Sequence, residues 1–144
     1  MARSLNIETL VEESLVTLLS GYVDVPVKRW EDNRDKALTP QVKVKATIAD
    51  QEPGTINLYA ASNLFVDIGV FTSKRIDTHG ETANDIRGDV RCLINQDDIV
   101  SGMNLTSGLF VYKNGVIPQT TFDVPDDQVF QKGISLLVVA TTIE

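Results

Sequence analysis

Residues 56–73 read INLYAASNLFVDIGVFTS, and this run decides how the rest of the chain has to fold. Its second half alternates between apolar and other residues, which is the period of a β-strand with one buried face. The predicted buried face is formed by Leu64, Val66, Ile68 and Val70. The run is much longer than the usual strand of about 5–6 residues, so we expect a strand that extends from the sheet as an arm. A bend or bulge is expected at Asn63 or Gly69.

Two phenylalanines lie on the other face of this run. Phe65 and Phe71 alternate with the predicted buried positions, so the core of the same chain does not cover them. We therefore take Phe65 and Phe71 as candidate residues for burial by a neighbouring subunit.

Alternating runs on both sides of this strand predict its partners in a sheet. Apolar residues at 42, 44, 46 and 48 alternate with Lys43 and Lys45, which predicts a half-buried strand with a cationic outer face. Residues 22–27 predict a short edge strand, because Pro26 has no N–H to donate. Two further strands are expected at 109–116 and 131–142. The last is apolar on both faces, so something must cover the second face of the sheet.

Two segments have helical spacing instead. Residues 7–20 predict an amphipathic helix capped by Asn6 or Ser4 and ended by a left-handed Gly21. Its predicted solvent face carries Glu8, Glu12, Glu13 and Thr17. Residues 79–95 predict a second helix, which follows a Thr-x-x-Glu capping box at 78–81. One further short turn is expected at 97–100.

The order of these elements predicts an α+β fold. We expect a mainly antiparallel sheet of about four to five strands, two helices packed on one face, and one long strand extending as an arm. The 144 residues and 15.8 kDa fit a single domain, 1–144. Apolar residues make up 42% and charged residues 23%, which excludes a disordered tail or a coiled coil.

Charge and cysteine content exclude several function classes. The net charge of −7 repels phosphate backbones, which argues against general nucleic-acid binding. One Cys and one His supply neither an internal disulfide nor a structural zinc site, and this usage fits a reducing compartment. We expect no membrane span, because no apolar run approaches about 18 residues, and no signal peptide.

Catalytic residues are not evident, and we expect no enzyme activity, no metal and no cofactor. His79 would need Asp77 as its orienting carboxylate, and it is better explained as a solvated residue at a helix start. Cys92 lies far from His79 along the predicted helix and borders its apolar stripe, so we expect it to be packed or partly buried. The acidic pairs at 97–98 and 126–127 lack the spacing of calcium ligands and are interpreted as turns.

One segment carries a net positive charge although the chain as a whole is acidic. Residues 28–45 have six cations against three anions, a net charge of +3, which leaves −10 for the remainder. The segment also holds Trp30, the only tryptophan, which favours a covering partner. It could bind an acidic protein surface or DNA that passes close by, or be a solvated loop. The candidate interface residues in it are Lys28, Arg29, Trp30, Arg34, Lys36, Lys43 and Lys45.

The whole layout resembles the tail terminator and tail-completion (neck) proteins of tailed bacteriophages. The likeness covers roughly residues 5–142 and includes P-x-V-x-V-x-A at 40–46, PGTIN at 53–57, DDI at 97–99 and VVATT at 138–142. It implies a non-enzymatic ring, typically a hexamer, that caps the tail tube protein and meets the head-tail connector protein. It further implies a place in the virion tail or neck after assembly in the host cytoplasm. Whether the lumen of the ring contacts DNA stays open at this point, and no sequence-specific contact is expected.

Two other interpretations stay open at this point. One is a small non-enzymatic α+β module that binds a protein or ligand through the Trp30 loop. The other is an enzyme that uses His79 with Asp77. A mass several times 15.8 kDa would favour the ring, and a strict monomer would favour the binding module.

Overall fold

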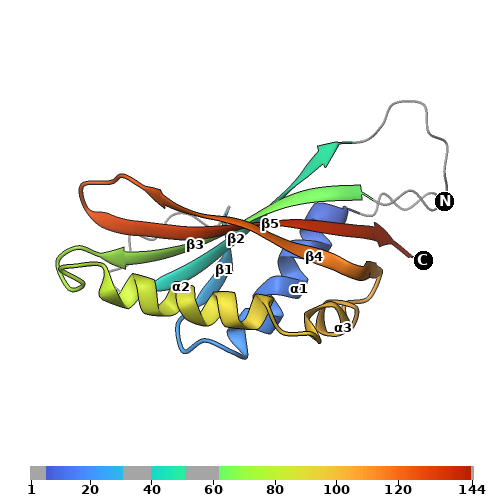
Figure 1. The fold of residues 1–144 in the computed structure, drawn as a ribbon, viewed down its shortest axis with the longest axis horizontal. Helices are drawn as coiled ribbons and strands as arrows, with labels where there is room; N and C mark the ends of the chain where they lie inside the picture. The colour runs from blue at the N-terminus through green and yellow to red at the C-terminus, as the bar shows by residue number, and fades with distance from the viewer. Residues whose placement is uncertain (1–5, 31–39, 51–61, 144) are drawn as a thin grey trace.

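The computed structural model describes residues 6–30, 40–50 and 62–143, apart from the side chains of 49 and 50 (Figure 1). Within these ranges the element order is α1 (Ile7–Ser20), β1 (Val27–Arg29), β2 (Gln41–Asp50), β3 (Ser62–Ser73), α2 (Glu81–Ile94), α3 (Ile99–Met103), β4 (Leu109–Val124) and β5 (Val129–Thr142). The predicted α+β fold is confirmed, with a short third helix where one further turn was expected.

The described strands form one five-stranded sheet in the order β1-β2-β3-β5-β4. Three of its four strand pairs are antiparallel, and β1 pairs with β2 in parallel. The helices lie on one side of the sheet (Figure 1). We call the sheet face that points toward them the inner face and the other the outer face.

The core lies between the inner face and the helices. The predicted apolar positions of β3 are all buried there, as are the apolar stripes of α1 and α2. The fully covered side chains include Val11, Leu15, Val44, Leu64, Ile68, Val90, Met103, Leu136 and Val138. All the described helices pack against the inner face. The outer face is therefore covered by no described helix, only by side chains of the sheet and its edges.

Several local predictions at the N-terminal end are corrected. Helix α1 has the predicted bounds, and Asn6 Oδ1 caps it by accepting the N–H of Thr9 at 3.2 Å. Gly21 is not left-handed, with φ of −83°, because the helix ends in an ordinary right-handed turn. That turn continues through Tyr22 and Val23, whose N–H groups both donate to Leu19, so the edge strand begins only at Val27.

The predicted bulge in β3 is wrong. Strand β3 pairs with β5 without interruption from Ser62 to Ser73, and the irregularity lies in β2 between Ile48 and Asp50. The described part of the predicted arm, 62–73, is an interior strand between β2 and β5, and residues 56–61 lie outside the described residues.

Strand β4 runs well beyond the predicted 109–116. Its register with β5 shifts between Val111 and Val116, where Asn114 has a φ of 59°, and again between Pro118 and Thr120. These shifts accommodate extra residues in β4 without ending its pairing with β5. Pro118 is tolerated because β4 is an edge strand.

Candidate interaction surfaces

Trp30 covers part of the outer face within its own chain. A Cβ placed on Gly69 would lie 2.7 Å from the Trp30 ring, so the indole packs directly on the glycine backbone. The Trp30 and Phe71 rings meet edge to face with centroids 5.3 Å apart, and Lys43 Nζ lies 5.0 Å from the Phe71 centroid. Gly133 beside Gly69 accommodates Phe122 in the same way. Trp30 and Phe71 therefore contribute to packing within the chain.

A partly buried ion pair ties α1 to the β1 edge of the sheet. Glu12, predicted to face solvent, is 3% exposed. Its Oε1 accepts from Arg29 Nε at 2.8 Å, and its Oε2 accepts from the backbone N–H of Ala46 at 2.8 Å. Ala46 lies in β2, beyond the last residue that pairs with β1. The Glu12 carboxylate therefore accepts the backbone N–H that would otherwise donate to a longer β1.

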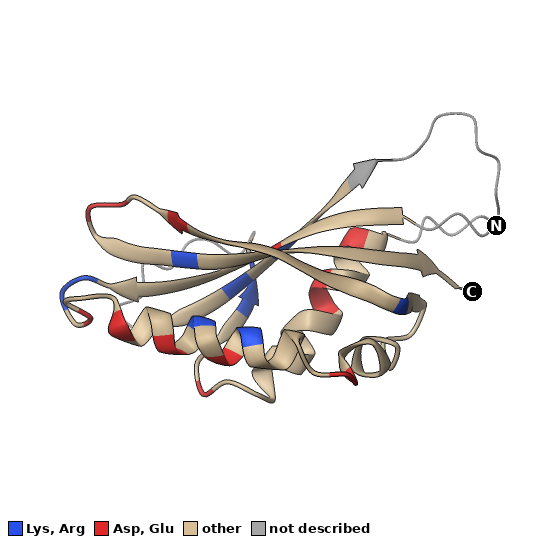
Figure 2. Ribbon diagram, in the orientation of Figure 1, with Lys and Arg blue, Asp and Glu red and all other residues tan. Residues whose placement is uncertain are grey.

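The predicted cationic surface of residues 28–45 is therefore divided. Arg29 is paired with Glu12. Lys43 lies on the predicted outer face but is only 3% exposed, so that face is less cationic toward solvent than expected. Lys45 is exposed and Lys28 is half-buried, while Arg34 and Lys36 lie outside the described residues. Figure 2 shows lysine and arginine on β1 and β2, acidic residues on α1, and residues of both signs on α2.

An apolar patch occupies the part of the outer face that Trp30 does not cover. Phe65, Leu137 and Ile117 form a row across β3, β5 and β4, because they pair directly in register. Phe65 is 51% exposed and Ile117 is 42% exposed. We call this surface the outer patch, and it consists of Phe65, Phe110, Tyr112, Ile117, Leu137 and Val139.

The outer patch continues toward the start of β4. Phe110 pairs with Thr141 and stacks edge to face on Tyr112, with ring centroids 5.2 Å apart. The alternation of apolar residues in the sequence predicted only part of the outer patch. Phe65 was a candidate, and the second apolar face of the last strand pointed to Leu137 and Val139. The β4 residues were missed, although Phe110 and Tyr112 alternate with buried positions in the same way.

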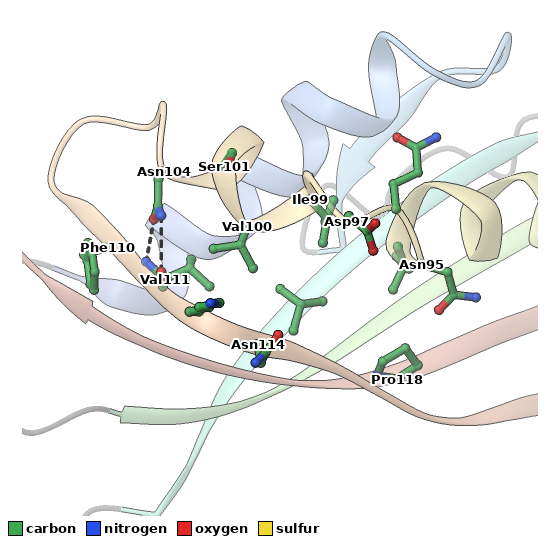
Figure 3. A pocket seen from close by; sticks show the side chains of 14 residues that line it. Asn95, Asp97, Ile99, Val100, Ser101, Asn104, Phe110, Val111, Asn114 and Pro118 are labelled. Carbon is green, nitrogen blue, oxygen red and sulfur yellow. Dashed lines mark hydrogen bonds between the residues drawn. The ribbon is translucent and has the colours of Figure 1, made fainter.

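A groove of about 680 Å³ lies beside the β4 edge, between that strand and the α2–α3 region (Figure 3). Its lining mixes apolar residues, among them Ile94 and Phe110, with polar ones such as Asn95, Asp97 and Asn114. The Asn104 side chain accepts the N–H of Val111 at 2.6 Å and donates to the Val111 carbonyl at 3.2 Å. The carboxamide therefore occupies the strand edge as a neighbouring backbone would, which closes this position to another strand.

The catalytic candidates are not assembled. Asp77 is buried and accepts from the Thr72 hydroxyl at 2.8 Å and from the N–H groups of Ala83 and Thr82 at 3.1 and 3.3 Å. It therefore caps α2, in place of the predicted capping box. Burial alone would raise the pKa of the Asp77 carboxyl, but these bonds and one from the Glu81 N–H hold it below its usual value.

The remaining candidates lie apart on the surface. His79 is exposed near the start of α2, and Cys92 is exposed on the same helix, which corrects the expectation that it is packed. Asp126 Oδ1 accepts the N–H groups of Gln128 and Val129, so this acidic pair belongs to a turn, as predicted. Among the described residues, no group of three or more His, Cys, Asp or Glu side chains could hold a metal ion.

No helix in the described ranges has both the length and the apolar character needed to cross a bilayer. Comparison with protein-family models finds none that matches the chain, and no curated protein matches it either.

Proposed function

We propose that the chain is a structural subunit of a tailed-bacteriophage virion, which forms a ring that caps the tail tube and joins it to the head connector. The observation that carries this proposal is the outer patch. A monomer leaves this apolar surface in water, whereas a subunit of a symmetric assembly buries such a surface against another molecule. The order of elements resembles the layout of the tail terminator and neck proteins, and this resemblance is what supports the phage assignment.

Mass measurement tests the assembly. Light scattering on purified protein should give several times 15.8 kDa, and negative-stain images should show rings with a central channel. Replacing the two most exposed residues of the Phe65–Leu137–Ile117 row, Phe65→Ser with Ile117→Ser, should lower that mass. The matched control is Ile76→Ser with Leu105→Ser, which removes apolar residues that are 68% and 86% exposed outside the patch and should leave the mass unchanged.

The capping role has its own test. Rings mixed with uncapped tail tubes should bind only at tube ends in micrographs. A strict monomer at high concentration that also leaves tube ends bare would refute the proposal.

A small binding module is the second candidate, and the groove beside β4 is the observation that favours it. Its expected anchor, Trp30, is packed against Gly69 within the chain, so the module would have to use the groove. A monomeric protein that loses partner binding on Asn114→Ala, with its fold intact, would favour this alternative.

A further inference from the structure

The proposed ring needs two different contact surfaces on each subunit, and the outer patch can be only one of them. If the outer patch met the same patch of another copy, the contact would close on itself as a pair with two identical faces. A ring whose two faces meet different partners instead joins the outer patch of one copy to a second surface of the next copy. That second surface lies outside the outer patch and has to suit an apolar sheet.

Helix α2 does not suit an apolar sheet. Its solvent side carries charges of both signs, on Glu81, Asp85, Arg87, Asp89 and Arg91. Against the outer patch these groups would lose water without gaining partners.

Two of the most exposed apolar side chains do not form a surface either. Ile76 lies between Arg75 and Asp77 in the chain, and Leu105 lies between two polar residues. Single apolar side chains in polar surroundings are common on protein surfaces and need no partner.

The turn between α1 and β1, residues 21–26, has the composition that the outer patch requires. We call it the α1–β1 turn. Tyr22 is 42% exposed, Pro26 is exposed, and Val25 next to it is half-buried. Asp24 is the single charged residue between positions 13 and 28. The turn therefore presents an aromatic ring, further apolar area and one carboxylate, and aromatic side chains are the usual anchors of protein contacts.

The fold holds the α1–β1 turn in place at both ends. The N–H groups of Tyr22 and Val23 donate to the Leu19 carbonyl at 3.0 and 2.9 Å, and the Pro26 carbonyl accepts the N–H of Val42 at 2.9 Å. Val23 is also buried in the core. A turn that is fixed in this way loses little conformational freedom when it meets a partner.

The α1–β1 turn and the outer patch lie on opposite sides of the molecule. Figure 1 shows the turn, in blue, on the helix side of the sheet and therefore away from the outer face. A contact between the two surfaces cannot be completed within a pair, because one copy keeps an unused turn and the other an unused patch. Repeating the contact adds copies in one direction and gives a ring when the rotation closes.

The charges beside the outer patch agree with this pairing. Lys45 lies on β2 and faces Asp67 on β3, whereas Lys113 follows Tyr112 on β4 and is exposed. Lys113 is therefore the better counterpart for the carboxylate of Asp24. An exposed ion pair contributes only about 0–1 kcal/mol, so this pair fixes the orientation and apolar burial supplies the affinity.

We propose that the outer patch of one copy binds the α1–β1 turn of the next copy, with the Tyr22 ring on the apolar side chains of the patch and Asp24 next to Lys113. This inference rests on the proposed function, because it names the two surfaces that join the subunits of the ring. The contact is heterologous, so the ring has two different faces, as a part that joins a tail tube to a head connector requires.

Two variants that each lack one of the surfaces test this contact. The patch variant carries Phe65→Ser with Ile117→Ser and keeps its turn, and the turn variant carries Tyr22→Ser with Asp24→Lys and keeps its patch. Each variant alone should sediment at the chain mass of 15.8 kDa, because no copy finds an intact counterpart. An equimolar mixture should sediment at about twice that mass and grow no further, because one intact patch then meets one intact turn.

The matched control is Asp89→Lys, which makes the same charge change on an exposed carboxylate of α2 and should keep the wild-type mass. Circular dichroism checks that each variant is folded, and the single changes Phe65→Ser and Tyr22→Ser serve if a double variant is not. The proposal is overturned if the turn variant keeps the wild-type mass or pairs with itself. It is equally overturned if the mixture fails to pair at the concentration at which the wild type assembles, or if Asp89→Lys lowers the mass as far as the turn variant does.

The failure of this contact and the failure of the proposed function give different results. Rings that persist in the turn variant refute the contact and leave the ring standing. Open chains of wild-type protein that the turn variant no longer forms refute the ring and leave the contact standing.

Discussion

The buried carboxylate of Glu12 allows the sharpest test of how α1 is held to the sheet. Glu12→Ala removes the acceptor of the Ala46 N–H and the partner of Arg29, both at 2.8 Å. Breaking a buried ion pair costs about 3–5 kcal/mol, and the Arg29 side chain is 34% exposed, so water recovers part of that loss. We expect a loss of about 2–4 kcal/mol, which corresponds to roughly 5–12 °C in Tm for a domain of this size.

Urea unfolding at one fixed protein concentration measures this loss, because assembly makes apparent stability depend on concentration. The matched control is Glu13→Ala, which removes an exposed carboxylate from the adjacent position and should stay within about 0.5 kcal/mol of wild type. A loss below about 1 kcal/mol for Glu12→Ala, or equal losses for the two variants, would refute the assignment of Glu12 as the tie between α1, β1 and β2.

Two further predictions concern the cap of α2 and the outer face. Asp77→Asn should lower the free energy of unfolding by about 1–2 kcal/mol at pH 7. The pKa of Asp77 in the folded protein lies below its ordinary value near 4. The stabilisation by the carboxylate is therefore complete above about pH 4 and disappears as the pH falls through the folded-state pKa. Urea unfolding at neutral and acidic pH measures it, and an equal loss at both would contradict it. Gly69→Ala should displace the Trp30 ring, cost about 1–3 kcal/mol and shift the tryptophan emission to longer wavelength. Gly88→Ala, where a Cβ meets nothing within 4 Å, should instead be neutral or slightly stabilising, and unchanged emission in Gly69→Ala would contradict the packing.

The candidate surfaces were only partly predictable. Phe65 was identified from alternation alone, because a residue opposite a buried face in a strand must lie on the other face. Phe71 has the same pattern, and only the fold shows that Trp30 packs against it. Alternation assigns a side chain to a face of the sheet and gives no information about which side chains from other strands lie over it.

The sequence by itself determined the elements whose signal repeats over a few residues. The helix at 7–20, the buried stripe of α2 and the inner face of β3 each follow from spacings of two, three or four along the chain. Such periods record the distribution of apolar residues between a core and solvent, which is a local property of each segment.

Only the tertiary structure decided the features that join segments distant in the chain. Glu12 has the spacing of a solvent-facing residue, yet it is buried because Arg29 and the edge of β2 at Ala46 compensate its charge across 17 and 34 residues. Trp30 lies in a charged segment, yet it packs against the outer face of the sheet because Gly69 leaves room for the indole. In both cases the free energy of burying the side chain depends on groups that only folding brings together. Burial of this kind produces no periodic pattern in the sequence.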